Sequence, residues 1–300
     1  MTRRGWALFL ALGIIWGIPY LFIRIAVREL DPVVVAFGRT AIGTLILLPL
    51  ALRARALRPL LRHWKALLVY TVVEIVGPWV LLGHAETRLN SSTTGLLIAT
   101  VPIVAAVLVT ALGQDRLDAR RIIGLVVGFC GVGLLVGLDF QASDTAAVLS
   151  VLVVVVGYAI GPIIITRYLS DLPSIGVVTG SLVIAAVAYT PFAALTWPAH
   201  ASAAALVSVA VLAVVCTAAA FLVMFALIAE AGPARMSMIT YVNPIVAVVL
   251  GAIVLGEPIT LGLLVGFPLI LIGSVLGTWR SRPRSPAAVP VPGAEPSEVR

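Results

Sequence analysis

Three side chains of the sequence, Glu74, Arg39 and His84, lie within long apolar stretches and could bind a solute or a proton. Glu74 lies near the middle of the stretch 64–86, His84 lies near its end, and Arg39 lies within the stretch 32–52. A charge at the centre of a membrane helix costs about 2.5 to 3.5 kcal/mol on insertion scales, so such residues are usually functional. Glu74 and Arg39 are therefore the first candidates for a binding site.

Glu74 shares one predicted helical face with a phenol and an imidazole. Successive members of this face are three or four residues apart, which is the spacing of one side of an α-helix. They are Tyr70, Glu74, Gly77, Leu81 and His84. We expect this face to contact protein or a water-filled cavity, where Glu74 binds a cationic substrate group or carries a coupled proton. The alternative is a structural acid that pairs with Arg39 or bonds to a neighbouring helix.

Arg39 lies on one face with Ala36 and Gly43, small residues that would let another helix or a ligand approach closely. Its guanidinium could bind a substrate carboxylate through two hydrogen bonds. A fixed counter-ion that stabilises the fold is the other interpretation, and the one we favour. Arg24, near the far end of the first apolar stretch, is expected to extend its head group to the membrane interface.

Two prolines occupy matching places in two similar segments. Pro102 lies in TVPIVAAVL (100–108) and Pro244 lies in VNPIVAVVL (242–250). Proline removes a helical hydrogen bond, so we predict a hinge or cavity-lining role for both; the alternative is that membrane helices simply tolerate them. Tyr241 and Asn243 add polar side chains beside Pro244 and are further candidates for substrate binding.

A constant offset of 142 residues relates the two halves of the chain. It superposes Pro102 on Pro244, and also Pro49 on Pro191, Gly124 on Gly266, Gly131 on Gly273, Asp115 on Glu257 and Trp16 on Tyr158. Trp16 and Tyr158 could bound a cavity from two sides, or pack between helices. We predict two repeats, residues 4–138 and 146–280, followed by a disordered cytoplasmic tail at 281–300.

The composition indicates lipid as the solvent of these repeats. Hydrophobic residues make up 61% and charged residues 11% of the 300, against about 45 to 50% and about 25% in a soluble domain. Apolar runs of about 20 residues recur, and continuous runs exclude a membrane barrel. The fold class we predict is an all-α membrane protein of ten transmembrane helices in two inverted five-helix repeats. The expected spans are 6–27, 32–52, 64–86, 91–112, 120–138, 145–168, 173–195, 205–229, 234–256 and 260–279.

The basic residues predict the orientation. Most Lys and Arg residues follow alternate spans, with the densest groups at 53–65 and 116–121, and such loops face the cytoplasm. Both termini are then cytoplasmic, and the second half, entering from the other side after an odd number of spans, is inverted. The first run is longer than a signal-peptide core, so we expect it to be retained. The net charge of +7 fits this topology, and no nucleic-acid partner is expected.

Several motifs resemble the drug/metabolite transporter superfamily, specifically its EamA-type ten-helix members. The resemblance covers residues 6–279, although the first half has GQD where GE is common. It implies export or exchange of small metabolites, often amino acids or drugs. The inverted repeat itself suggests alternating access with the substrate near the midplane. The motifs are Trp16-Gly17 with Arg24, Asp31-Pro32 with Arg39, Pro102 with GQDRL (113–117), and Pro244 with LGEPIT (255–260).

Other functions lack sequence support. HExxH, GxSxG and paired intramembrane aspartates, which an intramembrane enzyme would use, do not occur, nor does a nucleotide-binding GxxxxGK[ST] motif. We expect no cofactor and no metal; Cys130 and Cys216 lie in apolar runs. An uncoupled facilitator or a lipid flippase of the same fold stays open, as does proton coupling. GxxxG spacings, such as Gly124 with Gly128 and Gly273 with Gly277, predict close helix contact or a homodimer surface.

Overall fold

The computed structural model describes residues 1–113, 118–139, 144–232 and 236–278. Every regular element in these ranges is helical. Nine helical segments are long and apolar enough to cross a membrane, and Leu261–Gly277 is a shorter apolar helix. The prediction of an all-α, ten-span membrane protein is confirmed. The predicted tail at 281–300 lies outside the described residues.

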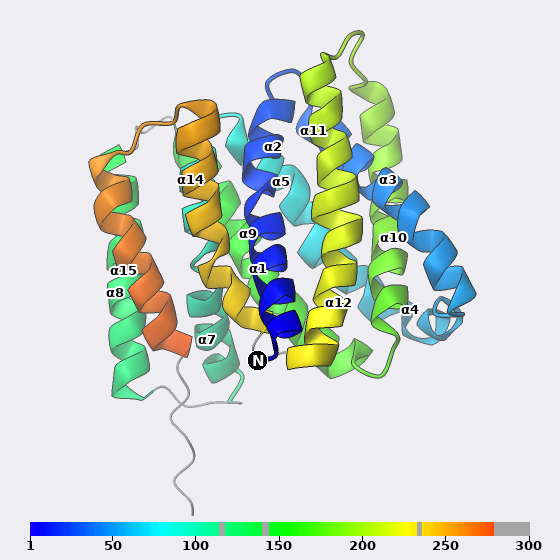
Figure 1. Ribbon diagram of the computed structural model, residues 1–300, viewed down its shortest axis with the longest axis horizontal. Coiled ribbons are helices and arrows are strands. Elements are labelled where there is room, and N and C mark those ends of the chain that lie inside the picture. The colour runs from blue at the N-terminus through cyan, green and yellow to red at the C-terminus, as the bar shows by residue number, and fades with distance from the viewer. Residues whose placement is uncertain (114–117, 140–143, 233–235, 279–300) are drawn as a thin grey trace, which may run out of the picture.

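The ten spans are built from continuous and interrupted helices (Figure 1). The first half contains α1 (Arg3–Gly17), α2 (Pro19–Ala26), α3 (Pro32–Arg53), η1 (Arg58–His63), α4 (Trp64–Thr71), η2 (Val72–Val76), α5 (Gly77–Glu86), α6 (Ser91–Ile98), α7 (Val101–Ala111) and α8 (Ala119–Asp139). The second half contains α9 (Thr145–Ile164), η4 (Ile165–Leu169), α10 (Ser174–Leu195), α11 (Ala203–Ala213), η5 (Val214–Ala219), α12 (Ala220–Ala231), η6 (Ser237–Tyr241), α14 (Asn243–Leu255) and α15 (Leu261–Thr278).

Local chemistry accounts for where several helices begin. Asp31 precedes Pro32, and its Oδ1 accepts a hydrogen bond from the N–H of Val33 at 2.8 Å. An acidic cap followed by proline at the first position is a preferred helix start. Ser202 caps α11 in the same way through the N–H of Ala205.

Two irregularities of the helices repeat with the sequence, whereas the π turn η4 of the sixth span has no counterpart in the first span. The third and eighth spans each contain a π turn, η2 from Val72 and η5 from Val214, whose first residues are again 142 apart. The fourth and ninth spans are each broken shortly before a proline, at the starts of α7 and α14. The two repeats therefore share backbone conformation as well as residues, which is the two-repeat architecture that the sequence predicts.

The last helices of the two halves, α8 and α15, pack along each other at one side of the bundle (Figure 1). A Cβ added at Gly124 would lie 2.4 Å from the backbone nitrogen of Gly277, and one at Gly273 would lie 2.4 Å from that of Gly128. Only glycine allows two backbones to approach so closely. These GxxxG residues therefore serve helix contact within the chain, one of the two roles expected of them.

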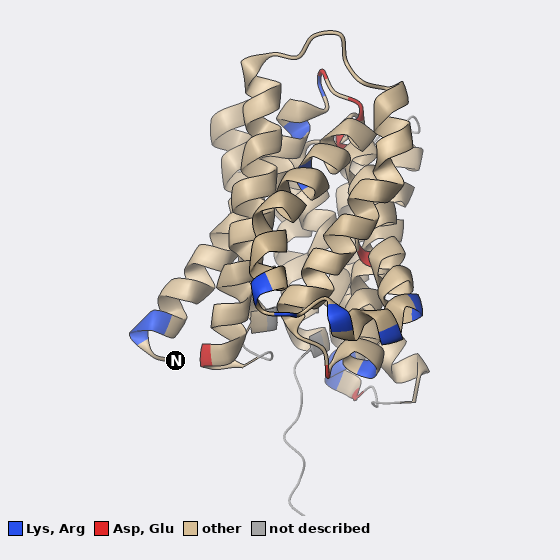
Figure 2. Ribbon diagram, turned by 90° about the vertical axis from the view of Figure 1, so that its right-hand side faces the viewer, with Lys and Arg blue, Asp and Glu red and all other residues tan. Residues whose placement is uncertain are grey.

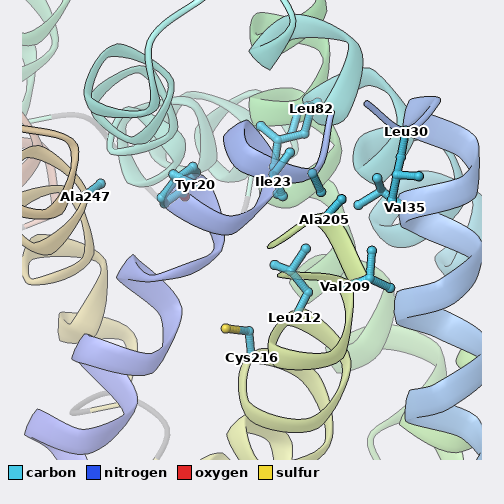
Figure 3. Packing of buried hydrophobic residues seen from close by; sticks show 12 residues of the cluster. Tyr20, Ile23, Leu30, Val35, Leu82, Ala205, Val209, Leu212, Cys216 and Ala247 are labelled. Atoms are coloured by element: carbon cyan, nitrogen blue, oxygen red, sulfur yellow. The ribbon is translucent and has the colours of Figure 1, made fainter. Parts of the chain in front are cut away.

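The charges separate the two ends of the bundle. Most Lys and Arg residues lie at the end that holds the N-terminus (Figure 2), which we call the basic end. The other end, at which α2, α5 and α14 finish, we call the opposite end. Between them, Tyr20 and Ile23 of α2 pack in one buried cluster with Leu82 of α5, Leu212 of α11 and Ala247 of α14, which joins the two halves (Figure 3).

Candidate functional site

Arg39 of α3 is buried at the interface between the halves. Its Nε donates to Oγ1 of Thr217 at 2.8 Å, and its Nη2 lies 3.5 Å from the carbonyl oxygen of Cys216. Its guanidinium carbon lies 3.7 Å from the centre of the Trp79 ring, a cation–π contact. No ion pair joins Arg39 to Glu74 among the described residues. One open interpretation of Glu74, a structural acid paired with Arg39, thus has no support in the geometry.

Glu74 lies on the π turn η2 and points towards α9. Its Oε2 atom is buried and has no hydrogen-bond partner. Gly161 of α9 leaves room for the carboxylate, because a Cβ at this position would overlap Oε2. Tyr70, which was expected on the same helical face, is buried and interacts electrostatically with Glu74. The carboxylate therefore has unused capacity to bind a cation or a proton at the centre of the bundle.

Side-chain hydroxyls bond to the main chain at the π turns η2 and η5, one from a neighbouring helix and one from the turn itself. The hydroxyl of Tyr189 in α10 donates to the carbonyls of Ile75 and Val76 in η2, at 3.1 and 2.9 Å. In η5, the hydroxyl of Thr217 donates to the carbonyl of Leu212 at 2.8 Å while it accepts from Arg39. A π turn loosens the regular ladder of helical bonds and often occurs at functional sites. Sequence reasoning missed Tyr189, although a tyrosine inside an apolar span is a usable signal.

The aromatic residues Trp16 and Tyr158 each contact the opposite half of the molecule. Trp16 packs edge-to-face on Phe221, with ring centres 6.3 Å apart. Tyr158 interacts with Trp79, and also electrostatically with Glu74 and Arg39. Phe221 and Trp79 are themselves 142 residues apart, so the two pairs occupy equivalent positions in the two repeats. The structure brings Tyr158, but not Trp16, next to the charged groups.

His84 lies away from Glu74, near the opposite end, and its side chain is exposed. The predicted face ran through both residues with regular α-helical spacing. The π turn at Val72–Val76 inserts an extra residue into the helix and rotates everything beyond it. Tyr70 and Glu74 therefore stay together, and His84 points elsewhere.

Tyr241 and Asn243 bond to neighbouring helices at the break before α14. The hydroxyl of Tyr241 donates to the carbonyl of Ser274 at 3.2 Å. With its amide oriented to suit its neighbours, Asn243 donates to the carbonyls of Ile239 and Gly13 at 3.0 and 2.9 Å. Both side chains thus hold the ninth span against the tenth and the first.

Pro102 and Pro244 each stand in the first turn of a new helix, α7 and α14, rather than in the middle of a continuous one. At the first break, the carbonyl of Ala99 accepts a hydrogen bond from the hydroxyl of Ser274 at 2.9 Å. The breaks give both spans a joint at equivalent depth. A hinge or cavity-lining role for the two prolines stays a prediction.

A second group of polar residues closes the opposite end. Glu257, in the linker from α14 to α15, accepts hydrogen bonds from the N–H groups of Ser91 and Ser92, at 2.8 and 3.0 Å, and from the Ser92 hydroxyl at 2.5 Å. We call this contact of Glu257 with the start of α6 the Glu257 clamp. Next to it is a pocket of about 120 Å³ whose lining includes Ser92, Thr93 and Thr260.

Glu86, at the end of α5, is fully buried beside the Glu257 clamp. Arg24 of α2 donates to its main-chain carbonyl, so Arg24 is bonded within the protein instead of extending to the interface as expected. Sequence reasoning missed Glu86, because an acid at the end of an apolar run looks like an ordinary boundary of a span.

Glu29, in the loop between α2 and α3, makes a further contact between the halves at this end. Its carboxylate accepts from the N–H and the hydroxyl of Ser202, both at 2.8 Å. These two donors hold the pKa of the exposed Glu29 carboxyl below its usual value. A lowered pKa means that the contact is fully present above the usual value and is lost as the pH falls through the lowered one.

Within the described ranges, no group of three or more His, Cys, Asp or Glu residues could hold a metal ion. Cys130 and Cys216 are free thiols, the first exposed and the second buried. The chemistry available at the centre is therefore that of one carboxylate, one guanidinium and the surrounding aromatic rings.

Comparison with known proteins relates this arrangement to membrane transporters. The sequence matches the EamA-like transporter family at residues 3–137 and again at 145–279. YvbV of Bacillus subtilis, described as an uncharacterized transporter, is 29% identical over 296 residues, which are 94% of each chain. YedA of Escherichia coli K12, described as an uncharacterized inner membrane transporter, is 29% identical over 300 residues, 95% of this chain and 94% of its own. A protein of known crystal structure shares the fold, with a TM-score of 0.67 at 18% identity over 93% of this chain and 98% of that one.

Proposed function

The chain belongs to the EamA-like transporter family, and we propose that it is a secondary transporter that exports small metabolites carrying a cationic group, such as amino acids or drug-like amines. The observation that carries this proposal is the buried, unpartnered carboxylate oxygen of Glu74 at the centre of the bundle. A buried carboxylate without donors is unfavourable unless a cation or a proton compensates it.

The substrate site consists of Glu74 with Arg39 and the aromatic rings of Trp79 and Tyr158. Glu74 binds the cationic group of the solute or the coupled proton. Arg39, already stacked on Trp79 and bonded to Thr217, fixes the positive side of the site. The apolar surroundings then select small molecules with some aromatic or aliphatic surface.

Alternating access is the mechanism that two inverted repeats support, because the halves can exchange conformations and open the centre to one side at a time. The π turns and the breaks before Pro102 and Pro244 are the places where the spans can bend. With the basic end in the cytoplasm, both termini are cytoplasmic in a multi-pass protein of the cytoplasmic membrane. Transport of this kind requires no enzymatic step.

Transport by reconstituted protein tests the proposal. Proteoliposomes would be offered a panel of radiolabelled amino acids and cationic drugs, with and without a pH gradient. We expect uptake of at least one cationic or zwitterionic solute, driven by the gradient, and we expect Glu74→Gln to lose the response to the gradient.

Glu230→Gln is the matched control, because Glu230 is an acid at the basic end that bonds to the Thr2 hydroxyl and lies 4.0 Å from Arg4, far from the centre. It should transport like the unaltered chain. Normal gradient-driven uptake by Glu74→Gln would refute the role of Glu74. Uptake that does not depend on the pH gradient in any variant would instead favour an uncoupled facilitator. Movement of labelled lipid across the bilayer would favour a flippase.

A further inference from the structure

Glu86 is a buried carboxylate that the proposed substrate site does not use. Its exposed fraction is 0%, and neither Oε1 nor Oε2 has a hydrogen-bond partner. Arg24 lies beside it, but the guanidinium donates to the main-chain carbonyl of Glu86 and leaves the carboxylate unbonded. Burying a charged carboxylate without donors is costly, whereas a neutral carboxylic acid is tolerated.

Glu257 next to it has the opposite surroundings. Its two oxygens accept three hydrogen bonds, two of them from backbone N–H groups at the start of α6. Backbone N–H groups at the start of a helix are favourable partners for a carboxylate. Two nearby carboxylates in such different surroundings are suited to different roles in proton binding. Glu86 is the one whose two oxygens have no hydrogen-bond donor.

The charged and titratable groups that act on Glu86 come from two elements. Arg24 and Tyr20 face it from α2, and Glu257 faces it from the linker after α14. Of the helices packed on α5 in the described chain, only α2 adds a charged group that acts on it. A negative charge on Glu86 would attract the guanidinium of Arg24 and repel the carboxylate of Glu257. It would also draw water towards this buried site.

We propose that Glu86 is a proton-binding site at the opposite end, which keeps its proton while that end is closed and releases it as the end opens. The inference rests on the proposed transport function, since a transporter must open and close this end in each cycle. The Glu257 clamp joins the linker of the second half to α6 of the first half. Repulsion between the two carboxylates weakens this clamp, so proton release and opening are coupled.

The test measures how accessible a cysteine beside the clamp is at different pH values. Thr93→Cys is placed in a chain without Cys130 and Cys216, because Thr93 is 8% exposed and lines the pocket. The purified protein in lipid nanodiscs is alkylated with a membrane-impermeant maleimide. The rate is divided by that of Ile259→Cys, which is 58% exposed in the same linker as Glu257, to remove the ordinary pH dependence of thiols.

We expect this ratio to rise with pH, by at most about tenfold per pH unit, the limit for one titrating group. Glu86→Gln should keep the low ratio at every pH, because its neutral side chain holds the end closed. Glu86→Asp retains a titrating group and should retain the pH dependence. Glu29→Gln is the matched control, an exposed carboxylate at the same end with a lowered pKa. Above about pH 5 the Glu29 carboxyl no longer titrates, so this variant should keep the parent's rise of the ratio with pH.

A ratio that stays constant with pH in the parent chain would overturn the proposal, and so would a Glu86→Gln variant with the parent's pH dependence. The first of these results does not depend on whether Glu86→Gln folds. The assay needs no transported solute, so its failure leaves the proposed transport function standing. Conversely, if no solute of the panel is taken up, the alkylation result still holds and the proposed substrate class is wrong.

Discussion

At the scale of single residues, two charged residues inside the spans of the first half have uncharged counterparts in the second half. Glu74 corresponds to Cys216 and Arg39 corresponds to Ser181 under the offset of 142, and both counterparts are buried. The charged groups thus belong to one of the two equivalent interfaces only. If the proposed site binds a solute, a duplicated scaffold with one charged interface would hold it in a single orientation.

Gly161→Ala tests the position of Glu74 without touching the carboxylate itself. The added Cβ would overlap Oε2 of Glu74, so the carboxylate must move away from α9. We expect transport to fall by about tenfold, the effect of weakening one charged contact by about 1.4 kcal/mol. The measurement is the initial uptake rate in proteoliposomes.

Gly133→Ala is the control for this change, because a Cβ on this glycine of α8 meets nothing within 4 Å. It should leave the uptake rate unchanged. If Gly161→Ala transports as well as Gly133→Ala, the carboxylate of Glu74 does not have to lie against α9 for transport.

The sequence was enough to single out Glu74 and Arg39, because a charge inside an apolar run stands out against its neighbours. It was not enough to identify what they touch. Thr217 follows Arg39 by 178 residues, and no local pattern joins two such positions. The sequence did not identify Glu86, because an acid at the end of an apolar stretch does not stand out. Its burial depends on α2 and on the linker after α14, which are distant in the sequence.

At the scale of elements, the π turns are the feature that regular periodicity could not predict. The ten spans follow from apolar length alone, and the start of α3 follows from Asp31 and Pro32. A sequence pattern read with 3.6 residues per turn cannot show where an extra residue enters the helix. The expected face from Tyr70 to His84 therefore holds only as far as η2.

Tyr189→Phe tests whether α10 stabilises the π turn of the third span. The change removes the two hydrogen bonds that the Tyr189 hydroxyl donates to the carbonyls of Ile75 and Val76 in this turn. A buried carbonyl without its donor costs about 1 to 3 kcal/mol, so we expect a lower temperature of thermal unfolding in detergent.

Tyr168→Phe is the matched comparison, because Tyr168 is 52% exposed at the basic end, beside Arg167. Its removal should leave the unfolding temperature nearly unchanged. Equal unfolding temperatures for the two variants would show that the π turn does not depend on Tyr189.

At the scale of the whole molecule, the inverted repeat determines what kind of motion the protein can make. The offset of 142 residues, visible in the sequence, recurs in the π turns η2 and η5, in the helix breaks and in the paired positions of Trp16 with Phe221 and Tyr158 with Trp79. The contacts that close one end were not predictable, because they involve linker residues such as Glu257 whose partners come from the other half.

The proposed mechanism requires the two ends to open in alternation, and distances between spin labels at repeat-related positions show whether they do. One pair of labels replaces Arg62 and Leu112 at the basic end, and the equivalent pair replaces Ala204 and Val254 at the opposite end; all four side chains are exposed. Electron–electron distances would be measured in nanodiscs over a range of pH and with each solute of the uptake panel. We predict that every condition that lengthens one distance shortens the other. Two distances that change in the same direction, or that never change, would contradict alternating access.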